Sequence, residues 1–276
     1  MKIYNDTITS RQNPTVKWAS SLADKKGREN ARSFMVEGVK LTLESIEKCL
    51  PVSHIFISED KKDKYLPDIL AAIRSASNED VEIFILSEGA FSKISTEKSP
   101  QGVISIIKYL DFFRQLDIIY KEDFSKLDNE RAIALCSVRD PGNLGAVIRS
   151  SVAFGVDRIL LTKDCADVYN PKTVRSAMGT LFNVKIDIVS DFASLIKAAK
   201  DAGRRVFAAE LTDNAIPLSE ASARSTDIFI IGNEGHGIPK EISELCTSSV
   251  YIPISKNTES LNASVAAAIF MWEQSK

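Results

Sequence analysis

Three polar segments of the chain carry side chains that could do chemistry, and each follows an apolar run typical of a strand. Side chains at the carboxyl ends of parallel strands face the crevice where open α/β sheets bind ligands, so the three segments could converge on one site. Amide, guanidinium, carboxylate and hydroxyl groups orient and polarise a ligand, which suits the transfer of a group that a cofactor has already activated. These side chains are Asn143 and Arg149 in the first segment, Glu234 in the second, and Ser260 and Asn262 in the third.

The first two segments also have an ordinary structural interpretation. The glycines around Glu234 could form a strand-to-helix turn, with Pro239 opening the next helix. A helix is predicted over residues 143–154 with Asn143 as its N-cap. Arg149 lies off the apolar face of that helix, and solvent exposure is the ordinary state of such an arginine. The occurrence of three similar segments in one chain favours a site.

Composition and residue spacing argue against several classes of protein. The 276 residues are 44% hydrophobic and 26% charged, as in an ordinary soluble globular protein. The apolar runs are too short for a membrane span and the start lacks the apolar core of a signal peptide, so we expect a cytoplasmic protein without membrane contact. The four cysteines are scattered and there are only two histidines, so we expect neither a disulfide framework nor a metal site.

Common nucleotide-binding and hydrolase signatures are missing. The first glycine-rich turn completes neither G-x-x-x-x-G-K-[ST] nor the dinucleotide-binding G-x-G-x-x-G. The G-x-S-x-G elbow is absent, and no Ser-His-Asp set can be built on the two histidines. An α/β-hydrolase is therefore disfavoured.

Alternating helical and strand patterns divide the chain into two α/β domains. Residues 1–110 form a small domain, residues 111–129 are expected to be a linker helix, and residues 130–276 repeat a strand-then-helix order. Strands separated by single helices imply a parallel sheet. In this second domain we expect strands near 131–138, 158–162, 184–189, 205–210, 227–231 and 249–254, and helices at 143–154, 191–202, 239–246 and 262–273.

The distribution of charge is uneven. A net charge of −2 argues against a protein that coats nucleic acid non-specifically. Between Arg11 and Lys40, however, seven basic residues stand against three acidic ones. A solvated helix face is the ordinary explanation for such a run, but Trp18 and Phe34 within it keep a contact with RNA open.

The three polar segments together resemble the signature motifs of the SpoU (TrmH-type) family of RNA 2′-O-ribose methyltransferases, part of the SPOUT superfamily. In the amino-terminal half, two further stretches are similar to elements of the family's substrate-binding domain, so the resemblance covers most of the chain. The matching stretches are Asn143–Arg149, Ile231–Gly235, Ile252–Pro253 with Ser260–Ser264, Phe34–Lys40 and Ser99–Val103.

This resemblance implies an α/β fold in which a small RNA substrate-binding domain precedes a catalytic parallel-sheet domain of the SPOUT type. It implies a carboxyl-terminal trefoil knot, which general rules of chain topology disfavour, so this expectation rests on the resemblance alone. It also implies a homodimer with sites near the dimer interface, S-adenosylmethionine as methyl donor, and RNA as substrate. The additional domain favours ribosomal RNA over transfer RNA.

By the same resemblance, the family's catalytic positions fall on Asn143, Arg149, Glu234, Ser260 and Asn262. Cofactor contacts are expected at Gly232, Ile252 and Leu261, with backbone near Ala209. Arg149 would bind the phosphate beside the reacting ribose and bias the ribose hydroxyl toward deprotonation. A guanidinium is a very poor base, so we expect Arg149 to act through its charge and not by abstracting the proton itself. The remaining catalytic residues would hold the loops and the cofactor pocket in place.

Two other hypotheses stay open. The chain could be a non-catalytic RNA-binding relative, although its motif residues are intact. It could also be a nucleotide-dependent oxidoreductase that uses the glycines for a pyrophosphate, although their spacing departs from the fingerprint.

Overall fold

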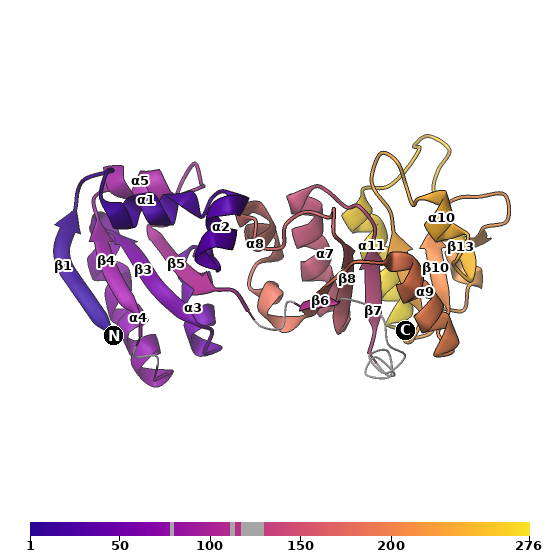
Figure 1. The fold of residues 1–276 in the computed structure, drawn as a ribbon, viewed down its shortest axis with the longest axis horizontal. Coiled ribbons are helices and arrows are strands. Elements are labelled where there is room, and N and C mark those ends of the chain that lie inside the picture. Colours follow the sequence, from indigo (N-terminus) through magenta and orange to yellow (C-terminus); the bar gives the residue numbers. More distant parts are fainter. Residues whose placement is uncertain (78–79, 111–113, 117–129) are drawn as a thin grey trace. The chain divides into compact units, whose positions relative to one another are not determined.

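The computed structural model describes residues 1–77, 80–110, 114–116 and 130–276, and they form two compact units (Figure 1). The N-terminal unit comprises Met1–Leu110 and Tyr169–Gly179, and the C-terminal unit comprises Asp111–Val168 and Thr180–Lys276. The small domain expected over residues 1–110 is therefore joined by a segment from the second half of the chain.

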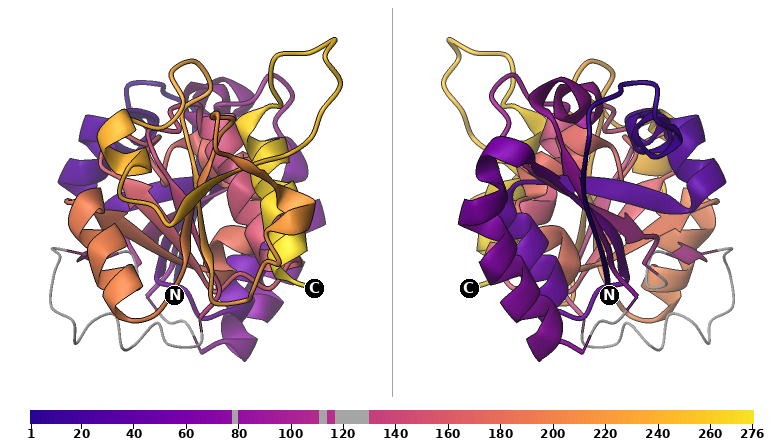
Figure 2. Two further views of the ribbon diagram at one scale, coloured as in Figure 1. Left: turned by 90° about the vertical axis from the view of Figure 1, so that its right-hand side faces the viewer. Right: turned by 90° about the vertical axis from the view of Figure 1, so that its left-hand side faces the viewer.

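The described part of the N-terminal unit contains a five-stranded sheet in the order β1-β4-β3-β5-β2. β5 is antiparallel to both of its neighbours, and the other pairs are parallel. Helices α1 and α5 pack on one face, while α3 and α4 cover the other (Figure 2, right). The elements are β1 (Lys2–Ile8), α1 (Pro14–Ser21), α2 (Lys25–Ala31), β2 (Ser33–Glu37), α3 (Val39–Glu47), β3 (Val52–Ser58), α4 (Lys62–Ser75), β4 (Glu82–Leu86), α5 (Glu88–Ile94) and β5 (Val103–Lys108).

Helix α8 (Pro171–Ala177) belongs to this same unit although it comes from the second half of the chain. It packs against β2 and buries Val174. The preceding Tyr169 stacks on Tyr109, with ring centroids 4.1 Å apart, and packs at a tilt on Phe34, with centroids 4.5 Å apart. Its hydroxyl also accepts a hydrogen bond from the Leu110 amide at 3.0 Å. The segment is thus an integral part of the N-terminal core.

The described part of the C-terminal unit contains an eight-stranded sheet in the order β11-β13-β10-β12-β7-β8-β9-β6, and every pair is parallel. The predicted parallel sheet is confirmed. The strands are β6 (Arg114–Leu116), β7 (Ala132–Leu135), β8 (Arg158–Thr162), β9 (Lys185–Val189), β10 (Val206–Ala209), β11 (Ile216–Pro217), β12 (Ile228–Ile231) and β13 (Ser248–Tyr251).

The prediction of a linker helix over residues 111–129 is wrong at the three residues of that stretch that the structure describes. Arg114–Leu116 form the strand β6, which pairs with β9. The rest of that stretch lies outside the described residues. A three-residue strand is too short to show a period of two in the sequence.

Helices pack on both faces of the C-terminal sheet (Figure 2, left). Successive side chains of a strand point to opposite faces, and β12 shows this alternation. Ile228 and Ile230 belong to the core beneath α9, whereas Phe229 packs on Phe270 of α11 with ring centroids 5.0 Å apart. The helices are α7 (Pro141–Ala153), α9 (Phe192–Asp201), α10 (Lys240–Ser243) and α11 (Ala263–Gln274). Each helix in the described chain is too short or too polar to serve as a membrane span.

Candidate active site

The three polar segments meet at the carboxyl ends of β7, β12 and β13. Asn143 donates from Nδ2 to Oε1 of Glu234 at 2.6 Å. Asn262 donates from Nδ2 to Oδ1 of Asn143 at 3.0 Å. One amide therefore joins all three segments, as the parallel strand order predicts.

Asn143 is available for this role because another residue caps its helix. Asp140 is the N-cap of α7, and its carboxylate accepts a hydrogen bond from the Asn143 amide at 2.8 Å. Pro141 takes the first helical position, where its missing N–H costs nothing. The prediction of Asn143 as N-cap is wrong, and the shift of the helix start leaves its side chain pointed at its neighbours.

Asn262 has both a capping and a bridging role. It is the N-cap of α11, and its Oδ1 accepts hydrogen bonds from the backbone of Ser264 at 2.9 Å and Val265 at 3.4 Å. The oxygen is committed to the helix, so the amide nitrogen is directed at Asn143. The start of α11 thus sets the position of the third segment.

Asn233 holds the loop that carries Glu234, and it was not among the predicted site residues. Its Nδ2 donates to the Ser137 carbonyl at 2.8 Å, and its Oδ1 accepts from the Gly235 amide at 2.9 Å. Its backbone pairs with Gly237 in both directions at 3.0 and 2.9 Å. An asparagine followed by glycines two and four residues later is the sequence signal for such a turn.

Two glycines let the same loop close. A Cβ on Gly232 would lie 2.5 Å from the Gly237 carbonyl carbon and 2.7 Å from the Ile238 nitrogen, both of them backbone atoms. Gly237 has a φ of +68°, which favours glycine. Glycine at these two positions therefore lets the loop fold back on itself without strain.

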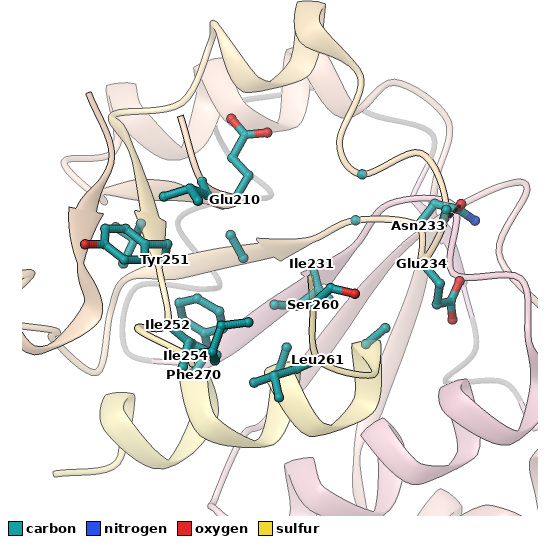
Figure 3. A pocket seen from close by; sticks show the side chains of 18 residues that line it. Glu210, Ile231, Asn233, Glu234, Tyr251, Ile252, Ile254, Ser260, Leu261 and Phe270 are labelled. Atoms are coloured by element: carbon teal, nitrogen blue, oxygen red, sulfur yellow. Dashed lines mark hydrogen bonds between the residues drawn. The ribbon is translucent and has the colours of Figure 1, made fainter. Parts of the chain in front are cut away.

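A cavity of about 300 Å³ lies beside this network (Figure 3). In the view of Figure 3, Glu210 lies on one side, and Ile252 and Leu261 on the other. All four predicted cofactor contacts line the cavity, together with Glu234 and Ser260. The lining residues are Ala209, Glu210, Leu211, Ile231, Gly232, Asn233, Glu234, Gly235, Gly237, Val250, Tyr251, Ile252, Ile254, Ser260, Leu261, Ala263, Ala266 and Phe270.

Glu210 is a second lining residue that was not predicted. Its Oε1 accepts a hydrogen bond from Ser249 Oγ at 2.9 Å and another from Ser243 Oγ. Two serines thus fix a carboxylate at the wall of the cavity. A polar residue directly after β10 was the available sequence signal, but a single acidic residue at that place is too common to stand out.

Arg149 is set apart from the other predicted residues. Its side chain is exposed on α7, it does not line the cavity, and it makes no hydrogen bond or ion pair with any residue that the structure describes. It lies six residues beyond Asn143, or roughly 9 Å along the helix axis. The structure therefore brings together Asn143, Glu234 and Asn262, with Ser260 at the adjoining cavity, and leaves Arg149 facing solvent.

Two ionisable groups near the site, the carboxyl of Asp164 and the thiol of Cys136, have shifted pKa values. Partial burial raises the pKa of Asp164, but hydrogen bonds from Ser137, Thr162 and Arg139 outweigh it and bring the pKa to about 2. Burial raises the pKa of the Cys136 thiol, at the end of β7, to about 11. A thiol of that kind is protonated at neutral pH and is a poor nucleophile. Across the described ranges, no group of three or more His, Cys, Asp or Glu is placed to hold a metal ion.

Comparisons with known proteins agree with this geometry. Residues 130–272 match the SpoU rRNA Methylase family, and residues 13–105 match the MRM3-like substrate binding domain. The 23S rRNA (guanosine(2553)-2′-O)-methyltransferase RlmP of Bacillus subtilis is 30% identical over 266 residues, which is 96% of this chain and 97% of that protein. The 23S rRNA (uridine(2479)-2′-O)-methyltransferase of Streptomyces viridochromogenes is 25% identical over 96% of this chain and 90% of its own length.

A solved structure shares the fold over nearly the whole chain. The AdoMet-bound rRNA methyltransferase from Sinorhizobium meliloti superposes with a TM-score of 0.81 at 27% identity, covering 99% of this chain and 97% of that one. The likeness therefore extends over both units of the chain.

Proposed function

Because the chain belongs to the SpoU rRNA methylase family, we propose that it transfers a methyl group from S-adenosylmethionine to a ribose 2′-hydroxyl of ribosomal RNA. The observation that carries the proposal is the hydrogen-bonded chain from Asn262 through Asn143 to Glu234, which joins the three family motifs beside one cavity. The names of the relatives support ribosomal RNA as the substrate class.

The cavity suits the proposed methyl donor. Its volume of about 300 Å³ is at the lower end of the range of small-molecule sites. Ile252, Leu261 and Phe270 offer an apolar wall, while the carboxylates of Glu210 and Glu234 suit a ligand with cationic and hydroxyl groups. Gly232, Ile252 and Leu261, with backbone near Ala209, would hold the donor, which supplies a methyl group already activated on a sulfonium.

The protein's own contribution is to orient and polarise the RNA. Asn143, Glu234 and Asn262 would hold the three motif segments together through their hydrogen bonds. The exposed Ser260 would help to close the cavity. Arg149 would bind the phosphate beside the target ribose and stabilise negative charge that develops on the hydroxyl oxygen. Such a transfer needs no Lewis acid, so we propose that it proceeds without a metal ion.

We also propose a homodimer that uses the outer face of α7 and α11. A groove of about 550 Å³ lies there, and its lining includes Phe154, Val265 and Trp272. Val265 and Trp272 are each 48% exposed, which is unusual for large apolar side chains. Ala146 of α7 also lines the groove, and Arg149 lies three residues further along the same helix. Residues three apart are neighbours on a helix surface, so Arg149 flanks the groove. A partner on this face would border the surface that Arg149 presents.

The remaining family features enter as parts of the same proposal. Residues 1–110 would bind RNA, residues 130–276 would carry catalysis, and the protein would work in the cytoplasm, where ribosomal RNA is found. The carboxyl-terminal part would form a trefoil knot. In support of the knot, β13 inserts between β10 and β11, and α11 then returns to pack on α7 and β12.

The test is methyl transfer by the purified protein. Radiolabelled S-adenosylmethionine and unmodified ribosomal RNA should give alkali-stable label, in the presence of a chelator as well as in its absence. Mapping of 2′-O-methylation in a strain without the protein should show one missing site. Methylation of transfer RNA alone would show that the substrate is transfer RNA and not ribosomal RNA. Donor binding without transfer to either RNA would indicate a non-catalytic relative.

A further inference from the structure

The basic run between Arg11 and Lys40 presents an exposed charged surface, but two of its residues that could have contacted RNA, Phe34 and Arg28, are buried. Phe34 is fully buried, so the RNA contact considered for it is wrong. Arg28 is buried as well and donates to backbone carbonyls. Six basic side chains of the run remain exposed against two acidic ones: Arg11, Lys17, Lys25, Lys26, Arg32 and Lys40 against Asp24 and Glu29. Trp18 is half-buried among them.

Trp18 forms one wall of a groove between α1 and α2. The groove has a volume of about 420 Å³, and the exposed side chains of Asp24, Lys26 and Asn30 also line it. An indole ring, an amide, a carboxylate and an ammonium group thus border one small space. A nucleobase offers the complementary surface, with a flat apolar face and a polar edge.

Contacts between α1 and α2 hold the walls of this groove in place before any ligand binds. A Cβ on Gly27 would lie 2.0 Å from the Ser21 carbonyl oxygen, so glycine allows α2 to lie directly against the end of α1. Arg28 Nη1 donates to the carbonyls of Leu22 at 2.9 Å and Ala23 at 2.7 Å, which fixes the turn between the helices. A preformed groove loses little entropy when a ligand enters.

Trp18 is supported by other rings on its inner side. Its ring centroid lies 4.6 Å from that of His54, which stacks on Phe84 at 6.0 Å. Burial lowers the pKa of His54, with a smaller opposing effect from Glu82 and a further lowering by Lys108, so the imidazole is neutral at physiological pH. The indole is thus backed by uncharged rings and has limited freedom to move.

We propose that the groove between α1 and α2 binds one unpaired base of the RNA substrate, stacked on Trp18. This inference rests on the proposed function, since it names the element of RNA that the N-terminal unit recognises. Asp24 and Asn30 would contact the polar edge of the base, and Lys26 would contact an adjoining phosphate. The surrounding positive charge would attract the backbone on either side.

Tryptophan fluorescence tests the stacking directly, because the chain has only two tryptophans, Trp18 and Trp272. Single-stranded oligoadenylate should quench emission of the full-length protein and of the Trp272→Phe variant, and should leave emission of Trp18→Leu unchanged. The duplex of oligoadenylate with oligouridylate has no unpaired base and should not quench Trp18. Equal quenching by strand and duplex would overturn the proposal.

Affinity measurements separate stacking from charge. Trp18→Leu should weaken binding of oligoadenylate about tenfold with an unchanged salt dependence, and Trp18→Phe should retain most of the affinity. Lys26→Ala should reduce the salt slope by about one, whereas Lys64→Ala, on the opposite face of the sheet, should change nothing. If Trp18→Leu fails to fold, the exposed Asn30→Ala decides: it should weaken binding several-fold, and wild-type affinity would overturn the proposal.

The same proteins separate this inference from the proposed function. Wild-type methyl transfer to ribosomal RNA combined with wild-type RNA affinity in both Trp18→Leu and Asn30→Ala would overturn the base-binding groove and leave the methyltransferase intact. Quenching of Trp18 by oligoadenylate in a protein that transfers no methyl group would do the reverse.

Discussion

Asn143 donates a hydrogen bond to Glu234 at 2.6 Å, although 91 positions separate the two residues in the sequence. The bond ties the start of α7 to the loop after β12, and Asn262 extends it to the start of α11. Because the bond joins the first turn of a helix to a loop, it stabilises the relative position of these two segments more than the core of the sheet. Changes in this network should therefore affect turnover before they affect folding.

A double-mutant cycle on this pair should show strong coupling. Glu234→Ala and Asn143→Ala should each lower kcat at least tenfold, and the double variant should be little slower than the worse single variant. Glu234→Gln keeps an oxygen that can accept from Asn143 and should retain more activity than Glu234→Ala. The exposed Glu220→Ala is the matched control. Additive losses would show that the two side chains act independently.

Gly232 and Gly235 should differ sharply in their tolerance of alanine. A Cβ on Gly232 would meet backbone atoms at 2.5–2.7 Å, whereas on Gly235 the nearest atom is Asn233 Oδ1 at 3.6 Å. Gly232→Ala should destabilise the fold by about 1–3 kcal/mol and weaken S-adenosylmethionine binding. Gly235→Ala should stay near wild type in both. Calorimetric titration and denaturant unfolding of the two variants check this, and equal behaviour would contradict the close approach.

Arg149→Ala should reduce single-turnover methyl transfer roughly a hundredfold, with little change in S-adenosylmethionine affinity, because Arg149 lies outside the cavity and is proposed to act on the RNA. Arg149→Lys should rescue poorly, since lysine lacks the planar fork that can hold a phosphate and a hydroxyl together. Arg224→Ala, an exposed arginine before β12, serves as control. A near-wild-type rate for Arg149→Ala would make it an ordinary solvated residue.

The cysteines should differ in reactivity and should make stability depend on alkaline pH. Cys49 is exposed, while burial raises the pKa of Cys136 to about 11 and of Cys246 to about 12. A thiol reagent at about pH 8 should modify one cysteine rapidly in the native protein and all four after unfolding.

Linkage sets the sign of the pH effect. The folded state holds the thiol protons of Cys136 and Cys246 more tightly than the unfolded state, whose thiols have pKa values near 9.0. Their contribution to stability is therefore complete below that pH and is lost as the pH rises toward 11. Denaturant midpoints of the wild type and of Cys136→Ala should converge over this interval, and parallel curves would contradict the assignment.

Removal of residues 1–110 should abolish most RNA affinity but should not give a well-behaved C-terminal unit. Tyr169 and Val174 are buried and belong to the N-terminal unit, where Tyr169 packs on Phe34 and Tyr109, so the truncated protein loses these contacts. We expect dye binding to exposed apolar surface and self-association. Replacement of residues 169–179 by a short polar linker should relieve both while S-adenosylmethionine binding is kept. Unchanged RNA affinity in the truncated protein would contradict RNA binding by the N-terminal unit.

The sequence predicted most of the catalytic sheet because its strands are apolar runs separated by amphipathic helices. β8 and β9 fall within a residue of their expected ranges, and the side chains expected at the strand ends do meet. Elements held by tertiary contacts escaped prediction. β11 has two residues and β6 three, and the unpredicted β1 (Lys2–Ile8) mixes polar and apolar residues without a clear period.

The site shows the same division. Glu234 and Asn262 could be placed because strand ends in a parallel sheet share one edge. Glu210 could not, since its position depends on Ser243 and Ser249, which come from later elements. The position of the helix start depends on whether Asp140 or Asn143, three residues apart, accepts the hydrogen bond from a free amide of the first turn. In the structure Asp140 does so, and the helix starts at Pro141.

The inclusion of Tyr169–Gly179 in the N-terminal unit has a consequence for the order of folding during synthesis. A nascent chain of about 110 residues already holds the five strands of the first sheet, but it lacks Tyr169, whose ring packs on Phe34 and Tyr109. The unit reaches its final packing only after β7, α7 and β8 have left the ribosome. The first-made part of the protein is thus completed by a segment of the second, and neither half of the chain can be exchanged for that of a relative by a single cut.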